Sequence, residues 1–171
     1  MRKVILIALI VLGVGAYVYP FGSMDRYSNE ELVKRMYSPS VPVAVQAIRE
    51  IGLRRYKPAI PDLIEFCYAD VRQIRTAAMF SLGIMGAENA IEDLNYIVWD
   101  DSKMFTVWDR ISATLALGQI PKTDVRDLID ILNYHPNNKV ALAALKALEK
   151  RPEPAAKIAI KPYENYLKQM P

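Results

Sequence analysis

The sequence is poor in the residues from which metal sites and disulfide frameworks are built. Cys67 is its single cysteine, so an intrachain disulfide and a multi-cysteine metal site are excluded. His135 is its single histidine, which removes the metal and proton-transfer arrangements that need a second imidazole. We therefore expect no cofactor and no enzymatic activity. We interpret Cys67 as a small core residue and His135, beside a proline, as a loop residue.

An excess of one charge is also missing. The chain has 22 basic and 19 acidic residues, and two of the basic ones, Arg2 and Lys3, lie at the very N-terminus. Residues 23–171 therefore carry 20 basic side chains against 19 acidic ones. This near balance gives no electrostatic footprint for nucleic acid, so we expect no nucleic-acid partner.

Charged residues are absent from Val4 to Phe21, directly after Arg2 and Lys3. As a helix these 18 residues would span about 27 Å, slightly less than a hydrocarbon core of about 30 Å. We predict that residues 1–22 are a signal-anchor crossing a bacterial cytoplasmic membrane through residues 4–21, or a signal peptide cleaved near Ala16. Both interpretations place the C-terminal domain on the periplasmic or extracytoplasmic side.

The rest of the chain repeats itself. After a polar linker at residues 23–27 and a capping box at Ser28–Glu31, an Ala-rich segment recurs with start-to-start spacings of 31, 35 and 31 residues. The four copies are Ala47–Gly52, Ala78–Gly83, Ala113–Gly118 and Ala144–Glu149. Such a period predicts a helical solenoid. The glycine that closes the first three copies is interpreted as a helix stop in the left-handed conformation.

A second helix follows each of the first three copies, over residues 59–68, 89–100 and 123–133, with Leu63, Leu94 and Leu128 as equivalent core positions. One such hairpin cannot bury its apolar stripe alone and must stack. The last copy is followed by prolines, as expected of a terminal capping repeat. The predicted fold is an all-α, right-handed α-α superhelix of the HEAT/armadillo type with about four helical hairpins over residues 28–168.

The second copy resembles the HEAT-like repeats first described in phycobilisome lyases. The matching residues are Asp70, Val71, Arg72, Ala77, Ala78, Leu82, Gly83, Gly86, Ala90, Ile91 and Leu94. The first and third copies keep the Ala and Gly positions and lack the Val-Arg start. The resemblance implies a solenoid and is nearly silent about function, because proteins with such repeats act as scaffolds, as adaptors and, rarely, as enzymes.

The candidate partner-binding residues lie on the second helices, which in such solenoids line one face. Aspartates precede the equivalent leucines, and carboxylates or aromatic side chains follow at helical spacing. The set is Asp62, Glu65, Tyr68, Asp93, Tyr96, Trp99, Asp127, Asp130 and Tyr134. One interpretation is a groove for a protein or peptide bearing Lys or Arg. The other is that the aspartates bond to backbone amides or arginines and hold the repeats in register.

Two further clusters have ordinary explanations. Trp108-Asp109-Arg110 resembles the site of HEAT-like DNA-repair glycosylases, but the chain's near-neutral charge and expected export argue against that activity. Arg49, Arg54, Arg55 and Lys57 could meet lipid head groups, or they are solvated side chains at a helix end. The leading hypothesis is a non-catalytic interaction scaffold. The alternatives are an accessory subunit or enzyme of the lyase-like group, and a purely structural module of a membrane complex.

Overall fold

The computed structural model describes residues 24–168, so the predicted anchor or signal peptide at residues 1–22 lies outside the described part. Residues 24–168 form helices and turns and contain no strand. The helices are α1 (Asn29–Met36), α2 (Val41–Leu53), α3 (Ile60–Phe66), α4 (Arg72–Met85), α5 (Ile91–Trp99), α6 (Val107–Gln119), α7 (Val125–Tyr134), α8 (Asn138–Glu149), α9 (Pro154–Ile160) and α10 (Glu164–Leu167). Among residues 24–168 no helix has the length and apolar character needed to cross a membrane.

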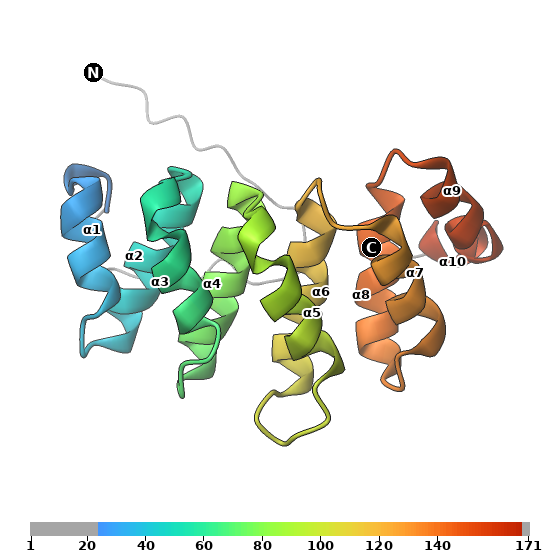
Figure 1. Ribbon diagram of the computed structural model, residues 1–171, viewed down its shortest axis with the longest axis horizontal. Helices are drawn as coiled ribbons and strands as arrows, with labels where there is room; N and C mark the ends of the chain where they lie inside the picture. The colour runs from blue at the N-terminus through green and yellow to red at the C-terminus, as the bar shows by residue number, and fades with distance from the viewer. Residues whose placement is uncertain (1–23, 169–171) are drawn as a thin grey trace.

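The helices are arranged in two layers, which confirms the predicted all-helical solenoid (Figure 1). The even layer consists of α2, α4, α6 and α8, each packed against the next. The odd layer consists of α1, α3, α5 and α7, and it is nearer to the viewer in Figure 1. Helix α9 packs against α7 and α8 and closes the C-terminal end. The elongated stack thus has two broad faces, one per layer.

Packing pairs each odd helix with the even helix that follows it in the chain, so that α3 packs against α4 and α5 against α6. Helix α1 packs against α2 in the same way, so the helix that contains the first sequence copy is the second member of the first pair. The equivalent leucines Leu63, Leu94 and Leu128 are fully buried between the layers, as predicted, and so is Cys67. Burying each leucine contributes about 1.5–3 kcal/mol to folding.

Local sequence signals define where several helices begin. Ser28 caps α1 through the predicted capping box with Glu31, and Thr106 caps α6 through an equivalent box with Asp109. Helix α4 runs from Arg72 to Met85 and is capped at its C-terminal end by Gly86, whose φ of 64° is left-handed. A glycine therefore stops this helix, three residues after the glycine that closes the sequence copy.

The predicted left-handed helix stop is wrong for Gly52, Gly83 and Gly118, because all three lie inside helices of the even layer. These glycines allow neighbouring helices of the even layer to approach each other closely. A Cβ on Gly52 would lie 2.5 Å from Cβ of Ser81, and a Cβ on Gly118 would lie 2.5 Å from Cβ of Ala147. A Cβ on Gly83 would lie 2.9 Å from Cα of Ala116. Each glycine thus accommodates the small residue of the next even helix, which sets the spacing of the layer.

Residues 24–27, expected as a linker, are held on the folded domain. Met24–Arg26 form a short 3-10 helix, and Arg54 at the end of α2 donates hydrogen bonds to the backbone oxygens of Met24, Asp25 and Tyr27 at 2.7–3.2 Å. Arg54 also pairs with Glu50 at 2.7 Å. Arg54 is therefore a structural member of the basic cluster, and the first described residue lies beside the end of α2.

Candidate functional site

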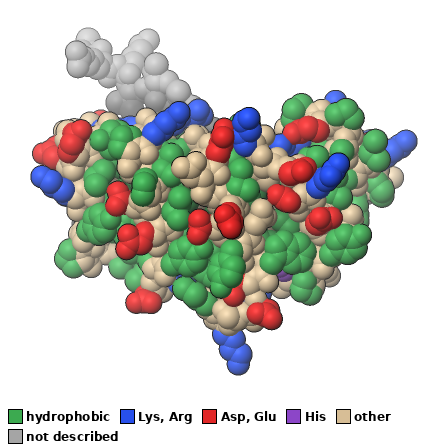
Figure 2. Space-filling view, in the orientation of Figure 1, with side chains coloured by type: hydrophobic (Ala, Val, Ile, Leu, Met, Phe, Trp, Pro, Cys, Tyr) green, Lys and Arg blue, Asp and Glu red, His purple; other side chains and the backbone are tan. Residues whose placement is uncertain are grey.

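The nine predicted binding residues lie on α3, α5 and α7 or directly after them, and these helices are neighbours in the odd layer. Figure 2 looks onto this layer and shows acidic side chains interspersed with hydrophobic ones over its middle, while Lys and Arg gather mainly toward the upper edge. Helices α3, α5 and α7 contain six acidic residues and one basic residue, Arg126. The outer surface of the odd layer, called the odd face below, is therefore acidic and aromatic.

The three aspartates connect neighbouring repeats. The Tyr37 hydroxyl donates to Oδ1 of Asp62 at 2.6 Å, and the Tyr68 hydroxyl donates to Oδ1 of Asp93 at 2.7 Å. In the third contact, the side-chain amide of Asn95 donates to Oδ2 of Asp127 at 3.2 Å. We call these three contacts the rungs. Each donor belongs to the preceding repeat, so the rungs fix the register of the odd helices.

The position of the aspartates explains why they suit this structural role. Asp62, Asp93 and Asp127 are each the third residue of their helix, where a negative charge interacts favourably with the helix dipole. The structural interpretation expected backbone amides or arginines as partners, whereas the observed donors are two tyrosines and an asparagine. Each carboxylate keeps a second oxygen as an acceptor.

The rung tyrosines are held in the protonated, donating form. The hydrogen bond to Asp62, followed by burial, raises the pKa of Tyr37 to about 12. Burial, and then the hydrogen bond to Asp93, raises the pKa of Tyr68 above its ordinary value. Because a phenolate could not donate to the carboxylate, both rungs persist across the physiological pH range.

Aromatic side chains form a second set of contacts on this face. Tyr96 lies 6.4 Å, centroid to centroid, from both Tyr68 and Phe105, and Trp99 lies 5.4 Å from the His135 ring. Three aromatic side chains of the predicted site nevertheless face solvent. The exposed fraction is 56% for Tyr96, 43% for Trp99 and 73% for Tyr134. Glu65 and Asp130 are also exposed, so these five residues carry the accessible part of the predicted site.

Sequence reasoning missed Tyr37, although a signal was present. Tyr37 stands five residues after Leu32, as Tyr68 stands five residues after Leu63, and both leucines are fully buried. Trp99 stands at the same position after Leu94, but it contacts His135 and is no rung donor. Asn95 and Phe105 have no equivalent in the first copies, and nothing in the sequence period indicates them.

His135 lies in the loop between α7 and α8, as predicted, and its side chain is buried there. It caps the C-terminal end of α7, its Nδ1 accepts from the Asn137 amide at 3.1 Å, and its Nε2 lies 3.1 Å from the Val98 carbonyl oxygen. Because Nδ1 accepts from the amide, the tautomer that fits both contacts has its proton on Nε2, which donates to the Val98 carbonyl. His135 thus joins α5 to α7 and supports the ring of Trp99.

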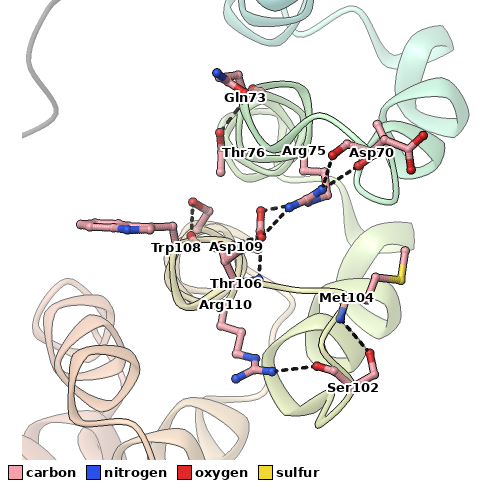
Figure 3. A network of polar contacts seen from close by, with 12 residues as sticks. Asp70, Gln73, Arg75, Thr76, Ser102, Met104, Thr106, Trp108, Asp109 and Arg110 are labelled. Carbon is pink, nitrogen blue, oxygen red and sulfur yellow. Dashed lines mark hydrogen bonds and ion pairs between the residues drawn. The ribbon is translucent and has the colours of Figure 1, made fainter.

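The Trp108-Asp109-Arg110 cluster is divided among different contacts (Figure 3). Asp109 is fully buried, pairs with Arg75 of α4 at 2.8 Å, and accepts from the backbone amide of Thr106 at 2.8 Å. Burial opposes ionisation of Asp109, but the hydrogen bonds from Arg75 and Thr106 outweigh it and hold the carboxyl pKa below its usual value. Arg110 donates to the Asp100 carbonyl at 2.6 Å, while the Trp108 side chain points away from those of Asp109 and Arg110.

The Cys67 thiol is buried, and the described residues form no cluster of metal ligands. Burial raises the pKa of the Cys67 thiol, and its Sγ lies 3.3 Å from the Leu63 carbonyl oxygen. Within the described part of the chain, no group of three or more His, Cys, Asp or Glu residues is placed to hold a metal ion.

The two helical layers and the rungs define a helical-repeat solenoid. Residues 74–95, which run from the first turn of α4 into α5, match the family model described as the PBS lyase HEAT-like repeat. This segment lies within the copy that the sequence motif identified, so the predicted resemblance is confirmed there. No curated protein matches the chain. Such repeats generally mediate contacts between proteins, and the fold therefore indicates at most an interaction scaffold.

Proposed function

We propose that the protein is a non-catalytic interaction scaffold that binds a basic protein or peptide through the odd face. The observation that carries this proposal is the exposure of Tyr96, Trp99 and Tyr134 on neighbouring helices, beside the exposed carboxylates Glu65 and Asp130. Exposed aromatic rings are the side chains that most often anchor a protein partner. The acidic excess of α3, α5 and α7 favours Lys and Arg in that partner.

The site of display is a separate part of the proposal. The uncharged segment Val4–Phe21 after Arg2 and Lys3 supports a membrane anchor with the repeat domain on the outer side of a bacterial cytoplasmic membrane. Protease added to spheroplasts should then digest the repeat domain. The mass of the mature protein should correspond to a chain that still contains residues 1–22. Protection from protease would refute the topology. A mature N-terminus just after Ala16 would identify a cleaved signal peptide.

The binding face can be tested by site-specific cross-linking in cells. A photoreactive phenylalanine analogue replaces Tyr96 or Tyr134, and in the matched control it replaces Phe80, which is exposed on α4 in the even layer. We expect positions 96 and 134 to give the same cross-linked species and position 80 to give none of it. The double substitution Tyr96→Ala/Trp99→Ala should abolish the cross-link from position 134.

The structural-module alternative makes the opposite prediction, and the rungs favour it because they engage all three aspartates within the chain. If the odd face has no partner, positions 96 and 134 should cross-link no more than position 80. The same result would refute the scaffold proposal. A circular dichroism spectrum of each variant establishes that the helices are intact.

A further inference from the structure

The outer surface of the even layer carries its own cluster of exposed apolar and cationic side chains. Leu53 on α2, Phe80 on α4 and Trp108 on α6 have exposed fractions of 61%, 45% and 58%. Ile84 and Leu115 extend the apolar part, at four residues from Phe80 and seven from Trp108, which places each on the same side of its helix. We call this surface, together with Arg49, Lys139 and Lys146, the even face.

Charge on the even face is of one sign. Arg49 and Lys139 are exposed, and Lys146 stands two turns after Lys139 on the same side of α8. The three acidic residues of the even layer are placed elsewhere. Glu50 pairs with Arg54, Asp109 is buried, and Glu149 stands at the position in α8 that corresponds to Gly52 in α2, which faces the neighbouring even helix. The basic even face therefore lies opposite the acidic odd face.

Aromatic and cationic groups are adjacent on this surface, because Trp108 and Lys139 line one pocket between the starts of α6 and α8. Apolar side chains flanked by Lys and Arg are the composition of surfaces that rest in the head-group region of anionic bilayers. There the apolar groups enter the acyl boundary, and the cations remain beside the phosphates.

Met24, the first described residue, lies at the edge of the even face. Arg54, next to Leu53, holds the backbone oxygens of Met24 and Asp25, so residue 24 is fixed at the C-terminal end of α2. Phe21, the last residue of the predicted membrane-crossing segment, precedes Met24 by only three residues. If residues 4–21 cross the membrane, only residues 22 and 23 lie between that segment and the first described residue. A short tether beside a basic, apolar surface favours the bilayer over an acidic protein as the occupant.

We infer that the even face lies on the surface of an anionic lipid bilayer and that the odd face consequently points away from it. This inference rests on the membrane attachment proposed above. Trp108 and Phe80 would sit at the head-group level, with Lys139, Lys146 and Arg49 contacting lipid phosphates. Binding would then fall with decreasing content of anionic lipid and with increasing salt.

The sequence supplies the probes for a test, because its two tryptophans, Trp99 and Trp108, lie in opposite layers. The full chain is reconstituted into vesicles of phosphatidylcholine with or without 30% phosphatidylglycerol, prepared with ordinary or brominated acyl chains. Bromine quenches only tryptophan at the bilayer. The Trp99→Phe variant, which reports on Trp108, should lose at least half of its fluorescence in brominated anionic vesicles and much less in neutral ones. The Trp108→Phe variant should lose little in either.

Charge variants test the role of the cations. Lys139→Gln/Lys146→Gln, introduced with Trp99→Phe, should reduce the quenching of Trp108 at least twofold. The matched control Arg126→Gln removes a cation from α7 in the odd layer and should leave the quenching unchanged. Circular dichroism of each variant checks that the helices remain folded.

Flotation of the same vesicles separates the two levels of the proposal. A chain that does not float with the vesicles refutes the membrane attachment and with it the orientation. A chain that floats without quenching of Trp108, or with equal quenching of Trp99, overturns only the orientation. Flotation without quenching of Trp108 would leave an acidic protein as the occupant of the even face.

Discussion

Replacing Arg75 by methionine should destabilise the repeat domain strongly at neutral pH. Arg75 Nε and Nη2 reach the two carboxylate oxygens of Asp109 at 3.1 and 2.8 Å, and Nη1 reaches the backbone oxygens of Ala69 and Asp70 at 2.8 and 3.0 Å (Figure 3). The substitution leaves a buried carboxylate without its cation, which costs about 3–5 kcal/mol. For a domain of this size the melting temperature should fall by roughly 10 °C.

The stability loss caused by Arg75→Met should depend on pH. Because the native pKa of Asp109 lies below its unfolded value of about 3.9, the ion pair stabilises the native state above about pH 4 and loses its effect as the pH falls through the native pKa. The stability difference between wild type and Arg75→Met should therefore be full at pH 7 and shrink toward pH 3. Urea denaturation followed by circular dichroism at several pH values measures it.

The matched control is Arg72→Met, which removes an exposed cation from the first turn of the same helix and should change stability by no more than about 0.5 kcal/mol. The double variant Arg75→Met/Asp109→Leu should recover only part of the loss, because replacing Asp109 also removes its side chain from the α6 capping box. An Arg75→Met penalty below about 1 kcal/mol, or one that is constant between pH 7 and pH 3, would refute this account of the ion pair.

Three other substitutions or treatments test the packing and the rungs. Gly118→Ala should cost about 1–3 kcal/mol through overpacking, and adding Ala147→Gly, which removes the clashing Cβ, should restore much of it in urea denaturation. Tyr68→Phe should cost about 1–2 kcal/mol by removing the donor of a rung, whereas Tyr134→Phe, at an exposed hydroxyl, should cost almost nothing. Cys67 should resist alkylation at pH 8 in the native protein and react promptly in denaturant; fast native labelling, measured by mass spectrometry, would show an accessible thiol.

The helical period was the part of the fold that sequence could predict well. Recurring alanines and the equivalent leucines Leu63, Leu94 and Leu128 depend on packing between neighbours, and packing acts through residue size and helical spacing, which are visible in one sequence. Helix pairing was harder. The chain order places α3 after α2, yet α3 packs against α4, because the contacts across the layers depend on the geometry of the connecting turns.

Glycine was misread because the same residue serves two physical purposes. Gly86 follows a helix and has a left-handed φ, whereas Gly83, three residues earlier, is helical and lies against Ala116 of the next repeat. A glycine three residues before another glycine fits either purpose in the sequence. The discriminating information is the small residue opposite it, which comes from a different repeat about 30 residues away.

The candidate site was predictable as a set of positions and not as a set of roles. Helical spacing correctly placed Asp93, Tyr96 and Trp99 on one layer, but it could not tell that Tyr68 donates to Asp93. That contact joins residues 25 positions apart and depends on the stagger of α3 against α5. The structure thereby separates the nine residues into four that join neighbouring repeats and five exposed ones that are accessible to a partner. The four are Asp62, Tyr68, Asp93 and Asp127.

The two faces can differ because residues between helices, and not on their outer surfaces, hold the stack together. In the even layer, glycines and alanines set the distance between neighbours, and in the odd layer the rungs set the register. Outward positions other than those of the rungs are therefore less constrained by packing, and random occupancy would mix charges on both sides. Instead the charges of the folded part, although nearly balanced in total, are divided between the faces. Helices α3, α5 and α7 contain six acidic residues and one basic residue, and the cations Arg49, Lys139 and Lys146 lie on the opposite, even face. Segregation of this kind is expected when the two faces meet different surroundings, and a charge-scrambled odd face with intact rungs should then fold normally and lose its partner.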